Sequence, residues 1–285
     1  MIEVVRAGSL TTVQDLGRPG LAHLGVGRSG AADRGSLRLA NRLVGNRESA
    51  ACLEITFGGF AARFAGACIV ALAGAPCPVR VSGRAGFMHG PIHVADGDEL
   101  RLGLPAQGVR TYLAVRGGFD VPPVLGSRST DVLAGLGPKP VWPGMRLPVG
   151  DAAAELPCVD VAPVAEIPEE PVLEVLPGPR DDWFTPAALT ALASHAYDVT
   201  AQSNRVGIRL SGVPLERSVT RELPSEGTVC GAVQVPPSGQ PVLFLADHPV
   251  TGGYPVIAVV SEPDICLAAQ ARPGQRIRFR LVPPR

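Results

Sequence analysis

The chain has 285 residues, of which 46% are hydrophobic and 18% are charged, a balance typical of a folded protein long enough for two modest domains. Lys and Arg total 26, as do Asp and Glu, so no net charge draws the chain toward nucleic acid or anionic lipid. Because no apolar stretch is long enough to span a bilayer and no targeting pattern is evident, we expect the protein in the cytoplasm.

Cysteine and lysine usage narrows the chemistry further. The six cysteines are scattered without a C-x-x-C pair, which predicts reduced thiols and argues against zinc. Lys139 is the only lysine and lies between two prolines. A phosphate loop of the G-x-x-x-x-G-K-[ST] type is therefore impossible. We also expect no biotin attached to this chain, and any ATP must be bound by other groups.

The N-terminal part begins with an expected strand at Glu3–Val5, followed by a sharp turn in Leu16–Gly20. Two interpretations of this turn stay open. In the first, Asp15 pairs with Arg18 in a structural turn. In the second, Arg18 contacts a ligand.

Residues 25–46 contain the clearest helical pattern, with Asp33 as the expected N-cap and a stop at Gly45–Asn46. The preceding loop, which holds Arg28, meets the N-terminus of this helix, where free N–H groups favour an anion. A carboxylate or phosphate bound there is one interpretation. The other is that Asp33 itself satisfies those donors.

Short strands dominate the next hundred residues. Alternation in Leu53–Phe57 predicts a half-buried strand. Further strands are expected at Ile69–Leu72, Val79–Val81, Leu100–Leu104 and Val109–Val115. His89 and His93 do not form a helical metal pair because Gly90 and Pro91 separate them.

A proline-rich stretch without periodicity predicts two domains, at residues 1–150 and 172–285, joined by a linker at 151–171. In the second half, Thr185 is expected to cap a helix from Pro186 to about His195. One helix per half among many short strands indicates closed β-barrels or rolls, a mainly β fold class.

Residues 225–260 hold the densest polar pattern. Strands are expected at Val229–Val235, Pro241–Ala246 and Val256–Val260, with a tight turn at Pro236–Gly239. Six polar residues lie at strand ends or on loops, where a β scaffold can hold them toward a ligand. They are Glu226, Gln234, Asp247, His248, Thr251 and Tyr254.

Asp247 and His248 are the best candidates for acid–base catalysis, because a loop histidine beside a carboxylate can titrate near neutral pH. The alternative is that Asp247 caps a turn and His248 fills surface space. Glu226 is a candidate second catalytic carboxylate. Asn204 and Arg205 could clamp a substrate carboxylate, although an arginine at a strand start also occurs as a solvated or barrel-end residue.

Several motifs in a consistent order resemble the allophanate hydrolase subunit 2 family, also called the biotin-dependent carboxyltransferase family. The motifs are TTVQDLGRPG (Thr11–Gly20), GVGRSGAADRGSLRLANRLVGN (Gly25–Asn46), LEITFGG (Leu53–Gly59), AVRGGFDVPPVLGSRSTD (Ala114–Asp131), LPGP (Leu176–Pro179), SNRVGIRLSG (Ser203–Gly212) and all of Ser225–Val260. The resemblance implies that each half is a cyclophilin-like β-barrel domain.

The resemblance also implies an activity, that of one subunit of an ATP-dependent 5-oxoprolinase, a hydrolase that opens 5-oxoproline to glutamate. The expected partner is a subunit-B-like protein of the allophanate hydrolase subunit 1 family, with ATP bound at a shared interface. A regulatory antagonist of a kinase inhibitor, or a carboxyltransferase component of a urea-processing system, are the alternatives. The substrate-binding candidates are Arg18, Arg28, Asn204, Arg205, Gln234, Thr251 and Tyr254.

Overall fold

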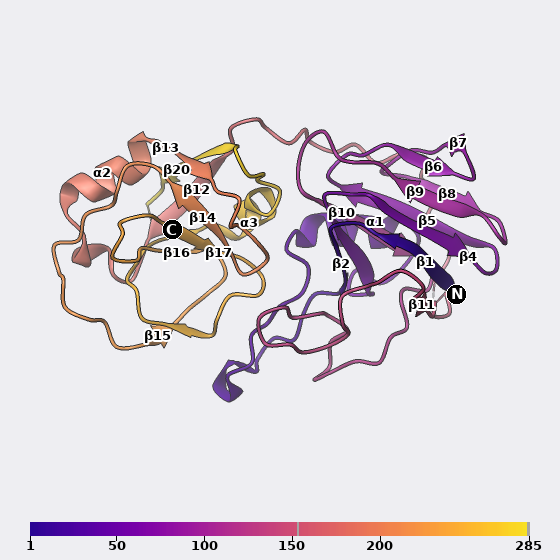
Figure 1. Ribbon diagram of the computed structural model, residues 1–285, viewed down its shortest axis with the longest axis horizontal. Helices are drawn as coiled ribbons and strands as arrows, with labels where there is room; N and C mark the ends of the chain where they lie inside the picture. The colour runs from indigo at the N-terminus through magenta and orange to yellow at the C-terminus, as the bar shows by residue number, and fades with distance from the viewer. Residues whose placement is uncertain (153, 284–285) are drawn as a thin grey trace. The chain divides into compact units, whose positions relative to one another are not determined.

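A computed structural model describes residues 1–152 and 154–283 and divides the chain into two compact units (Figure 1). The first unit comprises Met1–Arg18, Ser29–Asp131 and Gly135–Glu166. The second comprises Pro19–Arg28, Val132–Ala134 and Ile167–Arg285. The second unit thus includes two short segments that come from the N-terminal half of the sequence.

The first unit is built from two antiparallel sheets and one α-helix, α1 (Arg34–Leu43). The six-stranded sheet has the order β11-β1-β4-β9-β6-β7, and the five-stranded sheet has the order β2-β3-β10-β5-β8. The strands are β1 (Ile2–Ala7), β2 (Leu10–Gln14), β3 (Cys52–Thr56), β4 (Phe60–Phe64), β5 (Cys68–Gly74), β6 (Val79–Val81), β7 (Arg84–Ala85), β8 (Pro91–Val94), β9 (Glu99–Leu102), β10 (Arg110–Val115) and β11 (Arg146–Leu147).

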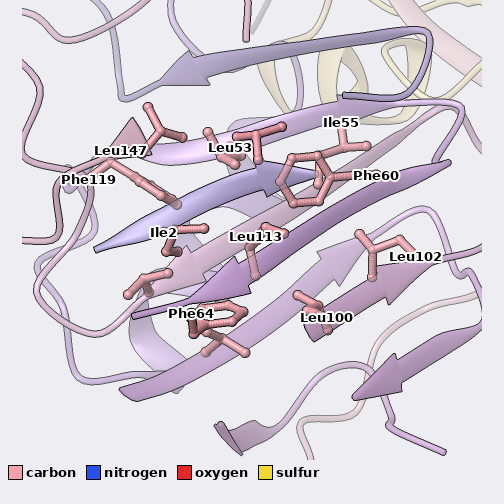
Figure 2. Close-up of a cluster of buried hydrophobic side chains, with 14 of the residues drawn as sticks. Ile2, Leu53, Ile55, Phe60, Phe64, Leu100, Leu102, Leu113, Phe119 and Leu147 are labelled. Carbon is pink, nitrogen blue, oxygen red and sulfur yellow. The ribbon is translucent and has the colours of Figure 1, made fainter. Parts of the chain in front are cut away.

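The core of the first unit lies between these sheets (Figure 2). Phe60, Phe64 and Leu100 from the six-stranded sheet pack with Leu53 and Leu113 from the five-stranded sheet, and none of them is more than 1% exposed. Burying a side chain of this size contributes roughly 1.5–3 kcal/mol. The apolar alternation of the strands therefore fixes which face of each sheet turns inward.

Helix α1 covers the outer face of the five-stranded sheet, where it contacts β5 and β10. The Asp33 carboxylate caps it by accepting hydrogen bonds from the Ser36 amide (2.9 Å) and hydroxyl (2.6 Å). The helix prediction and its N-cap are confirmed. The half-buried prediction for β3 is wrong, because Glu54 is only 1% exposed. The Glu54 carboxylate accepts from the Tyr112 hydroxyl (2.7 Å) and the Ala32 amide (3.0 Å).

The second unit contains a closed barrel with the strand order β12-β19-β16-β17-β14-β13-β20, and a separate ribbon of β15 and β18. The strands are β12 (Val172–Pro177), β13 (Ala196–Val199), β14 (Gly207–Ser211), β15 (Glu226–Gly227), β16 (Ala232–Gln234), β17 (Val242–Phe244), β18 (Thr251–Gly252), β19 (Val256–Val260) and β20 (Arg276–Leu281). The mainly β fold predicted from the sequence is confirmed, and closure of a barrel is explicit in this unit.

Helices α2 (Pro186–Ser194) and α3 (Glu262–Ala268) pack against β20 and β12 of the barrel. Thr185 caps α2 by accepting from the Ala188 amide at 3.1 Å, as the sequence predicts. The expectation of one helix per half is wrong, because α3 also belongs to this unit. Short 3₁₀ turns occur at Ala22–Leu24 (η1) and Asp181–Trp183 (η2).

Several element bounds differ from the expected ones. β19 matches the prediction, but β16 and β17 are shorter than expected. β2 extends through Gln14, where the sequence indicated only the approach to a loop. No helix in the described residues is both long and apolar enough to cross a membrane.

Candidate functional site

The β15–β18 ribbon of the second unit gathers several of the predicted site residues. Its register pairs Glu226 with Gly252 and Gly227 with Thr251, which places two loops of the 225–260 region side by side. Thr228 continues this contact, because its amide donates to the Val250 carbonyl at 2.9 Å. The ribbon therefore sets the spacing of the polar side chains on both loops.

Glu226 binds the guanidinium of Arg180 in a two-pronged ion pair. Arg180 Nε lies 3.1 Å from Glu226 Oε2, and Nη2 contacts Oε1. The hydrogen bond to Glu226 raises the pKa of Arg180 above its usual range. About a third of each side chain is exposed, so solvent reaches this pair.

His248 is held in a defined orientation beside the ribbon. Its Nδ1 lies 2.7 Å from the Pro249 carbonyl and 3.2 Å from the Thr228 hydroxyl. Because a carbonyl oxygen only accepts, this contact requires the proton on Nδ1 and leaves Nε2 as the basic nitrogen of the neutral ring. The imidazole stacks on Phe244, with ring centroids 5.9 Å apart.

Gln234 at the end of β16 contacts Tyr254, which lies on the loop between β18 and β19. The Gln234 carboxamide donates to the Tyr254 carbonyl at 2.7 Å. A Cβ added at Gly252 would lie 2.8 Å from Gln234 Nε2, so a side chain at this position would require the Gln234 carboxamide to shift. The exposed Tyr254 ring lies 5.9 Å from the guanidinium carbon of Arg217.

Arg205 and Asp247, which the sequence analysis assigned to different roles, face each other. Their side chains are 1% and 0% exposed and form two hydrogen bonds of 2.9 and 3.0 Å. Asp247 Oδ2 also accepts from the Val132 amide at 3.1 Å. The Asn204 carboxamide caps the turn before β14 by accepting from the Val206 amide at 2.8 Å. Arg205 and Asn204 were expected to bind a substrate carboxylate, and Asp247 was expected to transfer protons. In the structure, these groups instead make hydrogen bonds within the protein.

The remaining candidates lie elsewhere. Arg28 is exposed in the segment Pro19–Arg28 of the second unit, and Thr251 is exposed on β18. Arg18 is buried in the first unit. The structural alternative of an Asp15–Arg18 pair is wrong, since Arg18 donates to the Ser129 carbonyl at 2.5 Å instead.

Sequence analysis missed Arg180, Thr228 and Arg217, which contact Glu226, His248 and Tyr254 respectively. Arg180 follows the LPGP motif at the end of β12, a turn that could have directed attention to it. Thr228 and Arg217 carried no such signal.

Among residues 1–152 and 154–283, no group of three or more His, Cys, Asp or Glu side chains is placed to hold a metal ion. A hollow of about 470 Å³ in the first unit is lined by residues that include Cys68, Arg116 and Asp151. None of the predicted site residues lines it.

The chain matches a protein-family model and is similar to a named bacterial protein. A family model described as carboxyltransferase domain, subdomain A and B, matches residues 24–281. The C subunit of 5-oxoprolinase from Escherichia coli (strain K12) is 40% identical over 282 residues, which cover 98% of this chain and 90% of that protein.

Two solved structures are also similar. The crystal structure of TTHA0988 in space group P212121 aligns with a TM-score of 0.88 and 38% identity over 98% of this chain, which spans about half (55%) of that chain. The K. lactis urea amidolyase aligns with a TM-score of 0.90 and 30% identity over 98% of this chain, but this corresponds to only 18% of that chain.

Proposed function

Since the chain belongs to the carboxyltransferase domain family with subdomains A and B, we propose that it is the C subunit of an ATP-dependent 5-oxoprolinase. This enzyme opens the lactam of 5-oxoproline to glutamate. The family assignment confirms the one predicted from the sequence motifs.

The observation that carries the proposal is that the sequence similarity extends over nearly the whole length of both this chain and the E. coli protein. The similarity to the C subunit of E. coli 5-oxoprolinase covers 98% of this chain and 90% of that protein. By contrast, the chain spans 18% of the K. lactis urea amidolyase, which contains much more than this part. The name of the E. coli protein indicates that further subunits act with it, and we extend this to the present chain.

The chemistry of lactam opening fits the groups around the β15–β18 ribbon. Water adds to the lactam carbonyl, the C–N bond breaks, and the ring nitrogen takes up a proton. Because an amide nitrogen leaves poorly without that proton, the reaction benefits from a positioned acid–base group. Nε2 of His248 is suited to this role, since the Nδ1 contact to Pro249 fixes the tautomer.

Glu226 and Gln234 complete the proposed site. The Glu226 carboxylate is held by the planar fork of Arg180, which leaves it well oriented to act on a water molecule or a substrate N–H. The Gln234 carboxamide on β16 and the side chains of Thr251 on β18 and Tyr254 on the following loop supply neutral polar groups. In this proposal Gln234, Thr251 and Tyr254 bind and orient the substrate, Glu226 transfers protons, and none of the four acts as a nucleophile.

ATP is the proposed co-substrate, which activates the unreactive lactam. Because the only lysine is Lys139 between two prolines, this chain cannot form a phosphate loop. We therefore propose that a subunit-B-like partner of the allophanate hydrolase subunit 1 family supplies part of the nucleotide site. Because Lys139 has prolines on both sides, the chain also has no lysine in the Met-Lys-Met context of a biotin attachment site.

The experiment that tests the proposal is to purify the chain alone and with its proposed partner. Glutamate formation and ADP release are then measured with 5-oxoproline and ATP. We expect both only when the assembled subunits and both substrates are present. Glutamate formation by the isolated chain would contradict the subunit assignment, and no turnover from any assembly would contradict the substrate.

A second candidate function rests on the similarity to urea amidolyase, which has 30% identity and a TM-score of 0.90. In this alternative, the chain transfers a carboxyl group from a biotin carried on a separate protein. Carboxylation of urea by carboxybiotin, with no release of glutamate from 5-oxoproline, would favour it.

A further inference from the structure

Arg18 in the first unit carries a buried positive charge that makes no direct ion pair within the described part of the chain. Its side chain is 2% exposed, and Nη2 donates to the Ser129 carbonyl at 2.5 Å. Nε makes a longer contact of 3.4 Å with the Val124 carbonyl. Nη1 is buried and has no hydrogen-bond partner among residues 1–152 and 154–283. Within the described residues, no carboxylate lies at ion-pairing distance from this guanidinium.

Asp15 is the carboxylate nearest in sequence, but its oxygens are taken by other donors. They accept from the Gly17 amide (2.8 Å), the Ser127 hydroxyl (2.6 Å), the Ser129 hydroxyl (2.5 Å) and the Arg128 amide (2.6 Å). Ser129 thus contacts both charged groups, with its hydroxyl on Asp15 and its carbonyl on Arg18. The two charged groups therefore share Ser129 as a neighbour but make no direct contact among the described residues.

A buried guanidinium cannot lose its proton, so it retains its charge and its unfilled donor at any ordinary pH. Burying such a charge without a counter-ion is costly. From this we infer that Arg18 is the anchor of a carboxylate-binding site in the first unit. The missing counter-ion is the carboxylate of a small ligand, which Nη1 receives.

The turn Val124–Ser127 contacts the Arg18 guanidinium through the Val124 carbonyl. Val124 and Ser127 exchange two backbone hydrogen bonds, of 2.8 and 3.2 Å, which close the turn. Leu125 at its tip is half exposed and adopts φ +51°, a left-handed conformation unfavourable for a residue with a side chain. The long Nε contact to the Val124 carbonyl is the hydrogen bond that joins the turn to Arg18. Movement of the Val124 carbonyl alone frees Nε, so that Nε and Nη1 both become available while Ser127 stays on Asp15 and Ser129 keeps Nη2 in place.

The surroundings of Arg18 select the kind of anion. Asp15 and the carbonyls of Ser129 and Val124 place negative charge and negative dipoles close to the guanidinium. A singly charged carboxylate tolerates these neighbours better than phosphate, which carries more charge. The ligand class is therefore a small monocarboxylate. The choice of 5-oxoproline as this ligand rests on the function proposed above.

The test measures ligand-induced stabilisation of the full-length chain, both alone and in the assembled enzyme. Melting temperatures are recorded against rising 5-oxoproline, with inorganic phosphate at equal ionic strength as the second probe. The variants are Arg18→Lys, which keeps the charge but loses the planar fork, and Arg18→Gln. The control is Arg6→Lys, since exposed Arg6 also donates from Nε to a backbone carbonyl, that of Gly59.

We expect 5-oxoproline to raise the melting temperature of the wild type and of Arg6→Lys, by the linkage between binding and stability. Arg18→Lys should weaken this binding about tenfold or more, since an ammonium cannot replace the fork. If the Arg18 variants fold poorly, hydrogen exchange of the wild-type protein tests instead whether 5-oxoproline binds beside this turn. Added 5-oxoproline should then alter exchange in a peptide spanning 124–127 but not in one spanning β5.

Three results would overturn the site. They are no effect of 5-oxoproline on the wild type in either form, equal ligand affinity in Arg18→Lys, and stabilisation by phosphate as strong as by 5-oxoproline. A different result would contradict the proposed function but not the Arg18 site. In that result, the wild type binds 5-oxoproline through Arg18, but the assembled enzyme releases no glutamate.

Discussion

Arg205 and Asp247 form a two-pronged ion pair inside the second unit, with Nε–Oδ2 and Nη2–Oδ1 distances of 2.9 and 3.0 Å. The backbone strengthens the connection, because the Asp247 amide donates to the Arg205 carbonyl at 3.1 Å. The Val132 amide provides a further donor to the carboxylate. The pair thus joins the turn before β14, the turn after β17 and the segment Val132–Ala134. It organises the loop on which His248 lies.

The first prediction concerns the stability of this pair. Asp247→Ala removes the carboxylate that accepts two hydrogen bonds from the buried Arg205 guanidinium, which should lower the free energy of unfolding by about 3–5 kcal/mol. The double variant Arg205→Met with Asp247→Leu removes both charges and should recover most of this loss. Urea unfolding followed by circular dichroism measures both values.

A matched pair on the surface of the same barrel provides the control. Arg280 and Glu174 lie 2.6 Å apart but are 64% and 36% exposed. Glu174→Ala should therefore change the free energy of unfolding by no more than about 1 kcal/mol. Equal losses from the two single variants would show that burial of the Arg205–Asp247 pair has no energetic consequence.

The sequence could identify Arg205 and Asp247 as important, but it could not show that they contact each other. They lie 42 positions apart, and only the closure of β14 against β17 brings them together. The same holds for Asp15, whose partners Ser127 and Ser129 are more than 110 positions away. Contacts between polar residues far apart in the sequence arise from the fold and have no local sequence signature.

The second prediction concerns His248. His248→Ala should reduce turnover of the assembled enzyme by about 10²–10⁴-fold, the usual contribution of a positioned proton-transfer group. Stability should change little, because the side chain is only partly buried. The measurements are kcat for glutamate formation and the midpoint of urea unfolding. His195→Ala, which alters an exposed histidine at the end of α2, should leave kcat unchanged, and a similar loss in both variants would contradict the role of His248.

The third prediction separates chemistry from stability at Glu226. Glu226→Gln keeps the shape of the side chain but removes the charge that faces Arg180. Because this pair is about one-third exposed, stability should fall by less than about 1 kcal/mol. Turnover should fall at least about tenfold if the carboxylate takes part in proton transfer. A variant that keeps wild-type kcat would place Glu226 outside the chemistry.

Local signals predicted helices well when a cap and an apolar face occurred together. Asp33 before α1 and Thr185 before α2 are examples, and both side chains accept the expected amide hydrogen bond. The helix α3 was missed because Pro263 interrupts a short pattern. Pro at the first turn of a helix is well tolerated, so Ser261-Glu262-Pro263 was a start signal. The burial of Glu54 on the outer face of β3 involves Ala32, just before α1, and Tyr112 on β10, contacts that have no local sequence signature.

The fourth prediction is a pH dependence that originates at His89. Burial lowers the pKa of this imidazole below its ordinary value of 6.5. The unfolded chain therefore binds this proton more readily than the folded one. The resulting stability is present above about pH 6.5 and is lost as the pH falls through the folded pKa. His89→Asn removes the titrating group, and asparagine tolerates the left-handed φ of +64° at this position. Unfolding free energies at pH 5, 6 and 7 should fall less steeply toward acid in this variant, and identical slopes would exclude His89 as the source.

The last prediction concerns the packing of Ser129 against Arg18. It compares alanine substitutions at two nearby glycines, Gly135 and Gly137. Both Gly135 and Gly137 have left-handed φ angles, of +67° and +80°. A Cβ added at Gly135 meets nothing within 4 Å, so Gly135→Ala should cost only backbone strain, about 1 kcal/mol. A Cβ at Gly137 would lie 2.0 Å from the Ser129 carbonyl oxygen and 3.3 Å from Arg18 Nη2.

Since backbone at 2.0 Å cannot be relieved by a rotamer change, Gly137→Ala must displace Ser129, which holds both Asp15 and Arg18. We expect Gly137→Ala to be less stable than Gly135→Ala by at least about 1–3 kcal/mol, the usual cost of overpacking. It should also weaken 5-oxoproline binding, whereas Gly135→Ala should not. Urea unfolding and ligand-induced melting shifts of the two variants measure this difference. Equal stability and equal ligand response would show that the position of Ser129 does not control Arg18.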